Sequence, residues 1–283
     1  MIEEQSIIII AEDGYELSAI LRVPTRDRKG IVQIHSGTGI PQQLYANFAS
    51  YLTEKGYATL TFDYRGIAES APASLKGFKA TIRDWGMLDM TAVFNWVLTH
   101  FPEDKKIIVA HSMGGQMIGL MKNCDQIDQL VLIASSTGYW KDMDSPYKWL
   151  PAFFWYIMIP VHTKIFGYVN ARKVKQGENL PRGVALEWRK WCTNPTYFED
   201  DFRDTNQSLF FDKIKIPLLS IQVADDPLAN QTTATKLLKY YKNAQIQIQR
   251  IIPAEMGVQK IGHTGYFSRK FKDNLWKKLV TEL

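Results

Sequence analysis

The sequence predicts an α/β fold in which helices cover both faces of a mostly parallel sheet, and two observations support this. Short apolar runs alternate with helix-like stretches over the first third of the chain and again near its end, which is the pattern of a parallel sheet. Residues 138–212 break this alternation and hold 17 of the 35 aromatic residues. We therefore expect a core formed by residues 1–137 and 213–283, with a helical, aromatic-rich insertion at 138–212.

Each element of the core is predicted by the spacing of its apolar residues. A β-rich run, a turn signal at Asp13-Gly14 and a second alternating run indicate a hairpin. Gly56 is expected to end the first helix at the C′ position. The strands are expected at 6–11, 16–23, 31–34, 58–62, 106–110, 129–134, 217–223 and 246–252. The helices are expected at 42–55, 81–98, 114–122, 231–241 and 267–283.

The composition excludes several classes of protein. The chain has 283 residues, of which 46% are hydrophobic and 22% charged, so it is long enough for a large domain and too apolar for intrinsic disorder. Its formal charge of +5 is too small to predict a nucleic-acid partner. Cys124 and Cys192 cannot form a disulfide framework, which fits a reducing, cytoplasmic compartment. The acidic start of the chain predicts no signal peptide.

One apolar stretch in the insertion, Leu150 to Val169, raises the question of a membrane span. Two prolines, His162 and Lys164 interrupt it, whereas a spanning helix needs about 20 predominantly apolar residues. We therefore expect a helix packed over a cleft and no integral membrane span. Peripheral contact of this segment with a lipid monolayer remains open.

The strongest chemical signal is a serine between an apolar run and a helix-like stretch, in the sequence IVAHSMGG at 108–115. It resembles the G-x-S-x-G nucleophile elbow, with Ala110 in place of the first glycine. The serine of such an elbow lies on a strained turn, so its neighbours two positions away must be small. Ser112 is therefore the predicted nucleophile, and the backbone N–H of Met113 is a predicted oxyanion donor. An ordinary turn that happens to contain serine and glycine is the alternative.

A serine nucleophile needs a histidine base, which an acid in turn orients. Among the five histidines, His263 lies in a Gly-His-x-Gly loop near the end of the chain and is the predicted base. The acid is expected in the loop after the strand 217–223, where Asp226 is the preferred candidate and Asp225 the alternative. A structural histidine and a solvated Asp-Asp-Pro turn are the competing interpretations. The chain order Ser112, Asp226, His263 favours a triad.

Two further segments follow early strands. In Ser36-Gly37-Thr38-Gly39, the backbone N–H of Gly37 or Thr38 is the expected second oxyanion donor, with a plain glycine-rich turn as the alternative. In Asp63-Tyr64-Arg65-Gly66, the aspartate and the arginine are expected to form a hydrogen-bonded structural turn without a catalytic role.

With these segments placed, the chain resembles the α/β-hydrolase superfamily, and it is most similar to serine-aminopeptidase-like and lysophospholipase-like hydrolases. The resemblance implies Ser112 as nucleophile, His263 as base, Asp226 as acid and Met113 as an oxyanion donor. It also implies that the insertion occupies the position of a cap, or lid, domain. The motifs that carry the resemblance are SGTG at 36–39, DYRGI at 63–67, AHSMGG at 110–115, DDP at 225–227 and GHTG at 262–265.

The serine nucleophile and the resemblance together predict a serine hydrolase that cleaves an ester, thioester or amide through an acyl-enzyme. The aromatic insertion predicts an apolar acyl group beneath it, as in a carboxylesterase or a lipase-like enzyme. No metal or organic cofactor is implied. The expected partner is therefore a small-molecule acyl substrate, and the sequence indicates no oligomeric state.

Three alternatives to this hydrolase remain open. One is an acyltransferase with the same triad, and another is a non-catalytic ligand-binding module on the same fold. The third is a small-peptide aminopeptidase, which needs acidic groups in the cap to hold a peptide amine. The acidic residues available there are Glu178, Glu187, Glu199, Asp200, Asp201 and Asp204.

Overall fold

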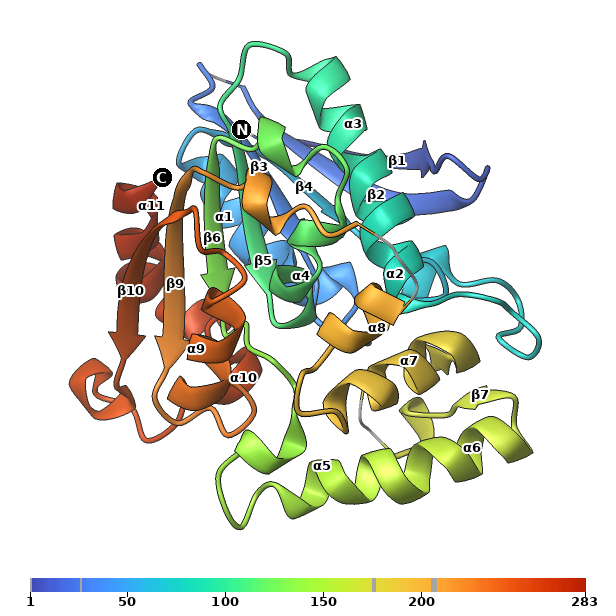
Figure 1. Cartoon of the computed structure of the whole chain (residues 1–283). Coiled ribbons are helices and arrows are strands. Elements are labelled where there is room, and N and C mark those ends of the chain that lie inside the picture. Colours follow the sequence, from blue (N-terminus) through green and yellow to red (C-terminus); the bar gives the residue numbers. More distant parts are fainter. Residues whose placement is uncertain (1, 26, 175–176, 205–207) are drawn as a thin grey trace.

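An eight-stranded sheet runs through the protein in the order β1-β2-β4-β3-β5-β6-β9-β10 (Figure 1). The computed structural model describes residues 2–25, 27–174, 177–204 and 208–283. Strand β2 is antiparallel to β1 and β4, and the pairs from β4 to β10 are parallel, which confirms the predicted fold class. The strands are β1 (Ile2–Ile10), β2 (Glu16–Pro24), β3 (Gly30–His35), β4 (Tyr57–Phe62), β5 (Lys106–His111), β6 (Gln129–Ile133), β9 (Pro217–Val223) and β10 (Gln245–Ile251), with β7 (Tyr168–Val169) and β8 (Leu180–Pro181) as a separate pair.

Helices cover both faces of the sheet, so its central strands are buried on both sides. Along β3, Ile31 belongs to the apolar cluster on one face and Val32 to the cluster on the other, as the two-residue period of a strand requires. Helices α1 and α11 contribute to the cluster of Val32, and α3 and α9 to that of Ile31. The helices are α1 (Ala46–Glu54), α2 (Ile82–Asp84), α3 (Thr91–His100), α4 (Met113–Gln116), α5 (Trp149–Phe153), α6 (Ile159–Ile165), α7 (Arg182–Cys192), α8 (Glu199–Asp204), α9 (Gln231–Leu238), α10 (Gly262–Gly265) and α11 (Lys277–Glu282).

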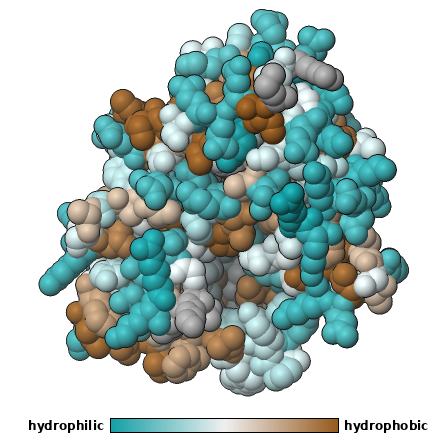
Figure 2. Space-filling view, turned by 180° about the vertical axis from the view of Figure 1, so that it is seen from behind, coloured by the Kyte–Doolittle hydropathy of each residue, from teal (hydrophilic) through white to brown (hydrophobic). Residues whose placement is uncertain are grey.

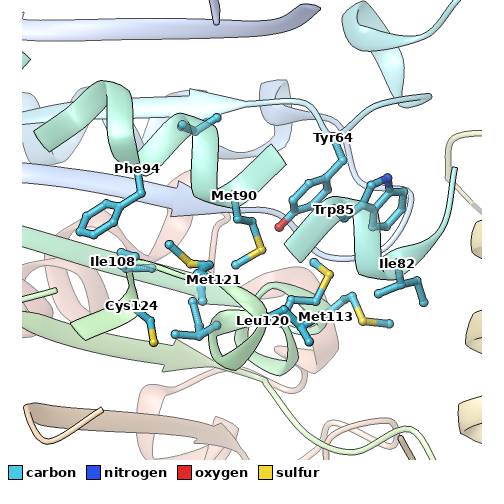
Figure 3. Packing of buried hydrophobic residues seen from close by; sticks show 14 of the residues in the cluster. Tyr64, Ile82, Trp85, Met90, Phe94, Ile108, Met113, Leu120, Met121 and Cys124 are labelled. Atoms are coloured by element: carbon cyan, nitrogen blue, oxygen red, sulfur yellow. The ribbon is translucent and has the colours of Figure 1, made fainter. Parts of the chain in front are cut away.

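An aromatic stack anchors the larger apolar cluster. The rings of Tyr64 and Trp85 are nearly parallel, at 13°, with their centroids 4.8 Å apart (Figure 3). Met90 lies next to the stack on the helix that continues from Trp85, and Phe94 lies about one turn further along it. The indole N–H of Trp85 donates to the carbonyl of Arg65 at 3.0 Å, so the buried polar atom is satisfied. The stack thereby holds the loop that follows β4.

The charged pair predicted in that loop has different partners. The Arg65 guanidinium bonds Asp89 at 2.7 Å and Asp13 at 2.5 Å. Asp63 instead accepts the backbone N–H of Gln42 at 2.8 Å. The prediction of a direct bond between Asp63 and Arg65 is therefore wrong, because each side chain points to a different neighbouring segment. Both nevertheless join separate parts of the chain, which is the structural role expected of them.

The helix predicted at 114–122 is much shorter in the structure. Helix α4 ends at Gln116, and a 3-10 turn, η4 (Ile118–Leu120), follows it. A Cβ on Gly119 would lie only 2.2 Å from the ring of Phe211, so this segment packs closer to the ring than a side chain would permit. Glycine is also a poor helix former. The other predicted helices of the core are present, with shifted ends and with 3-10 or π turns within them.

Most of the described residues between 138 and 204 lie beyond one end of the sheet (Figure 1) and form mainly short helices. Helix α5, the π turn η7 (Phe154–Met158) and α6 follow one another without a break. They form one continuous helix, 149–165, at the bottom of Figure 1. In the described ranges, the protein has no helix with the length and apolar character that crossing a membrane requires.

Candidate active site

Ser112 occupies a sharp turn between β5 and α4. Its φ is +51° and its ψ is −116°, a conformation that costs a non-glycine residue about 1–3 kcal/mol. Its N–H donates to the carbonyl of Ile133 on β6 at 3.1 Å, which ties the turn to the sheet. A Cβ on Gly114 would lie 2.8 Å from the carbonyl oxygen of His35. The close approach therefore requires a small residue two positions after the serine.

The turn of Ser112, the loop of Asp226 and the short helix α10, which carries His263, meet at the carboxyl ends of the parallel strands. The Nε2 atom of His263 lies 2.8 Å from Ser112 Oγ, and its Nδ1 atom lies 2.7 Å from Asp226 Oδ2. The second carboxylate oxygen, Oδ1, accepts the N–H groups of Leu228 at 2.9 Å and Ala229 at 3.1 Å. The carboxylate is thus held against Nδ1, and Nε2 is free to accept the serine proton.

The surroundings of Asp226 keep its carboxylate ionised. Burial raises its pKa, but the charge of His263, the hydrogen bond between the two and the two backbone donors together hold the pKa below its ordinary value. A negative charge beside Nδ1 stabilises the imidazolium that forms when His263 takes up a proton.

Asp225 has a different position from its neighbour. Its two carboxylate oxygens accept the backbone N–H groups of Ile261 and Gly262, both at 3.0 Å. These two residues immediately precede His263, so Asp225 ties the histidine loop to the loop after β9. Of the two acids considered from the sequence, the structure places Asp226 against His263 and Asp225 against the backbone. No pattern in the sequence indicates this second contact.

The predicted oxyanion donors differ in how their N–H groups are used. Met113 is the first residue of α4, where an N–H has no partner within the helix. The N–H of Gly37 already donates to Tyr45 Oη at 3.0 Å. Thr38 lines the same cavity as Ser112, whereas Gly37 is not among the described lining residues. This arrangement favours Thr38 over Gly37 as the second donor.

A buried hydrogen-bond relay joins the Gly37 loop to the His263 loop. Tyr45 Oη lies 2.8 Å from His111 Nδ1, and His111 Nε2 lies 3.0 Å from the carbonyl oxygen of His263. A carbonyl only accepts, so Nε2 carries the hydrogen and the Tyr45 hydroxyl donates to Nδ1. Burial, and then the charge of His263, lowers the pKa of His111 to about 3, which keeps the ring neutral. The sequence contains no signal for this relay, because its members are far apart in the chain.

A cavity of about 390 Å³ contains Ser112 and His263 in its wall. Residues of the 138–212 segment form most of its lining, and most of their side chains are aromatic or aliphatic. In the described part of the chain, no group of three His, Cys, Asp or Glu side chains is arranged to hold a metal ion. The apolar lining includes Tyr147, Phe154, Trp155, Met158, Leu180 and Trp188.

Most of the acidic residues that could hold a peptide amine are not among the described residues that line the cavity. Glu178 is the only acidic side chain in the described lining, and it forms an ion pair with Arg172 at 2.5 Å. Glu187 pairs with Arg83 at 2.8 Å. Asp200 and Asp201 pair with Arg203 and Lys190, respectively. The side chain of Asp204 is outside the described part, and Glu199 is not among the lining residues.

The chain is similar in sequence to one hydrolase family and in fold to several solved hydrolases. A family model described as serine aminopeptidase, S33, matches residues 26–178, just over half of the chain. An esterase of Pyrococcus furiosus has a similar structure, with 17% identity, a TM-score of 0.57, and coverage of 99% of this chain and 91% of that one. A lipase in an open form has 13% identity and a TM-score of 0.67, with 99% and 97% covered. A carboxyl esterase of Bacillus coagulans has 14% identity and a TM-score of 0.65, also with 99% and 97% covered.

At these identities the solved structures establish the fold, and they confirm the α/β-hydrolase fold expected from the motifs. A search of curated protein sequences gives no match.

Proposed function

The chain belongs to the serine aminopeptidase S33 family of α/β-hydrolases, and we propose that it is an esterase that forms an acyl-enzyme on Ser112. The hydrogen-bonded series Ser112, His263 and Asp226 in the wall of an apolar cavity carries this proposal. Membership of the family supports a hydrolase, and the apolar lining supports an uncharged acyl group as the part of the substrate that is bound.

In the proposed acylation step, His263 Nε2 takes the hydroxyl proton of Ser112 as Oγ attacks the acyl carbonyl carbon. The ionised Asp226 stabilises the resulting imidazolium. The backbone N–H groups of Met113 and Thr38 donate to the carbonyl oxygen while it carries negative charge. The ester C–O bond then breaks, and His263 gives the proton to the departing alkoxide. Water repeats the sequence on the acyl-enzyme and releases the free acid.

We also propose that residues 138–212 act as a cap on a core made of residues 1–137 and 213–283. The lining of the cavity supports this proposal. The core contributes Ser112 and His263, and the insertion contributes most of the apolar wall. A wall of this kind excludes water from the reacting atoms and strengthens each electrostatic contact there.

The cavity favours an esterase over an aminopeptidase with the same triad. A peptide amine needs an acid available for pairing, whereas Glu178 already pairs with Arg172. An acyltransferase would use the same atoms and differ in the nucleophile that attacks the acyl-enzyme. Product analysis with an added alcohol or thiol distinguishes that reaction from hydrolysis, because only transfer yields a new ester or thioester.

Fluorophosphonate labelling with peptide mapping tests the proposal. We expect the label on Ser112 in the wild type and no label in Ser112→Ala. Ser136→Ala is the matched control, because Ser136 lines the same cavity and its loss should leave the label in place. Hydrolysis of a p-nitrophenyl ester should fall by at least about 10⁴-fold in Ser112→Ala. A folded wild type that takes no label, or a Ser112→Ala variant that keeps its turnover, would contradict the proposal.

A further inference from the structure

The helix 149–165 exposes large apolar side chains along one face, which we call the apolar face. The exposed positions are three or four residues apart or adjacent, as expected for a single stripe on a helix. Lys164 is the only charged residue in the helix. Figure 2 shows hydrophobic surface along the lower margin of the protein, where this helix lies. The side chains are Trp149 (61% exposed), Leu150 (59%), Phe153 (55%), Tyr156 (46%), Ile157 (51%), Val161 (46%) and Ile165 (66%).

The apolar face is continuous with the mouth of the cavity. Leu150 and Phe153 are both more than half exposed, and both also line the cavity. Phe154 and Trp155, on the inner side of the same helix, continue the apolar lining toward Ser112. An apolar substrate held in a lipid layer at this face would enter the cavity without crossing water, which avoids the cost of hydrating its apolar surface.

Basic residues outnumber acidic ones in the segment that carries the apolar face, although Arg172 is paired with Glu178. Residues 139–173 carry five Lys or Arg residues and two Asp residues, and one of the aspartates, Asp142, is paired with Lys236 at 2.5 Å. The Nζ atom of Lys148 lies 5.8 Å from the ring centroid of Trp149, which belongs to the face. Aromatic and aliphatic side chains flanked by lysines are typical of a helix that lies in the headgroup region of an anionic membrane.

We propose that the apolar face docks on an anionic lipid surface, with the helix lying in the plane of the headgroups. Lys148 and Lys164 favour an anionic lipid surface over a second copy of this chain, because a second copy carries the same positive charges. The docking rests on the proposed function, since it serves an enzyme that takes its ester from a lipid layer.

Vesicle flotation tests the docking, with the full chain carrying Ser112→Ala so that binding is measured without turnover. The vesicles contain phosphatidylcholine alone, or phosphatidylcholine and phosphatidylglycerol in equal parts. We expect binding to the mixed vesicles, weakened by about tenfold or more in Ile157→Glu/Ile165→Glu. The control is Ile8→Glu/Ile10→Glu on the edge strand β1, whose isoleucines are similarly exposed, at 57% and 65%. This control should bind as the parent does.

A second pair of variants tests the role of charge. Lys148→Glu/Lys164→Glu should weaken binding to the mixed vesicles by roughly fivefold for each cation removed. Lys277→Glu/Lys278→Glu, at exposed lysines of the last helix, should have no effect. Hydrolysis of a water-soluble short ester by Ile157→Glu/Ile165→Glu, made with Ser112 intact, should match the wild type and show that the variant folds.

Three results would overturn the docking proposal. The first is an absence of vesicle binding, and the second is equal binding by the two isoleucine variants. The third is a concentration-dependent dimer in sedimentation velocity that Ile157→Glu/Ile165→Glu abolishes, without vesicle binding, because it assigns the face to a second copy of the chain. Flotation does not depend on turnover. Vesicle binding by a protein that takes no fluorophosphonate label would therefore support the docking and reject the esterase separately.

Discussion

The core and the 138–212 segment form two sides of one cavity by different physical means. On the core side, hydrogen bonds hold the groups of the site, as Asp226 holds His263 and Tyr45 holds Gly37. On the other side, rings pack against rings, as in the edge-on pair of Trp155 and Trp188 with centroids 4.5 Å apart. Hydrogen bonds are directional, whereas apolar packing is not. We therefore expect changes in the core to alter turnover and changes in the segment to alter substrate choice.

Asp226→Asn should produce the largest effect, because it removes a charge from the hydrogen-bonded core side of the cavity. The amide cannot stabilise the imidazolium of His263, and it favours the wrong tautomer of the ring, so kcat should fall by about 10⁴-fold. The measurement is kcat for a soluble p-nitrophenyl ester, together with a thermal melt that establishes folding.

Asp225→Asn provides the matched control for that variant. Its carboxylate accepts the two backbone N–H groups just ahead of His263, so the loss of charge should weaken two hydrogen bonds and lower kcat by about tenfold or less. It should also lower the melting temperature. Equal losses of kcat in the two variants would contradict the distinct positions that the structure gives these neighbouring acids.

The core should also lose stability in acid, because it buries two neutral histidines. Burial lowers the pKa of His35 to about 3, and burial with the charge of His263 lowers that of His111 to about 3. In the unfolded chain each histidine titrates near 6.5. Between these values the unfolded chain binds more protons, so the unfolding free energy falls as the pH falls. These two histidines should lower the unfolding free energy by about 4 kcal/mol between pH 7 and pH 5. Burial raises the pKa of Asp89 to about 7 and that of Glu187 to about 6, and these two acids oppose the fall.

Urea unfolding at several pH values measures this loss. His35→Gln should remove the contribution of one histidine, about 2 kcal/mol between pH 7 and pH 5. The lowered pKa of Asp226 acts in the same direction at still lower pH, because its contribution disappears only as that carboxylate becomes protonated. A slope that is unchanged in His35→Gln would show that the buried ring does not cause the acid sensitivity.

Tyr45→Phe should have a smaller effect, confined to the relay. Without the hydroxyl, the N–H of Gly37 and the Nδ1 of His111 lose their shared partner, which should lower the unfolding free energy by about 1–3 kcal/mol. The loops of Gly37 and His263 are then no longer linked, and kcat should fall by about tenfold. Tyr57→Phe, at the first residue of β4, is the control and should keep the wild-type kcat.

The sequence revealed the parts of the site that depend on contiguous residues. The elbow around Ser112 is such a part, since a strand, a serine and small residues follow one another in the chain. Whether Asp225 or Asp226 contacts His263 depends on how two distant segments of the chain meet. Two adjacent aspartates in a sequence do not indicate which of them makes the contact. The relay through Tyr45 joins residues 66 positions apart. It depends on tertiary contacts that no local pattern encodes.

Trp188→Ala should have the smallest effect, and it tests the apolar side of the cavity, which residues 138–212 form. Trp188 lines the cavity and packs against Trp155 and Phe154, with ring centroids 4.5 and 5.9 Å away. Loss of the indole enlarges the cavity, so the preferred acyl chain in a p-nitrophenyl ester series should become longer. For short esters kcat/KM should fall by about tenfold or less, as expected for lost apolar contacts.

The same ester series with Trp149→Ala serves as the control for this variant. Trp149 belongs to the same segment but is 61% exposed and lies outside the lining, so its loss should leave the chain-length preference unchanged. For Trp188→Ala, kcat on the best ester should stay close to the wild type, because no hydrogen bond to Ser112, His263 or Asp226 is lost. A fall in kcat without a change in preferred chain length would mean that the segment acts in the reaction itself, and the division between the two sides of the cavity would fail.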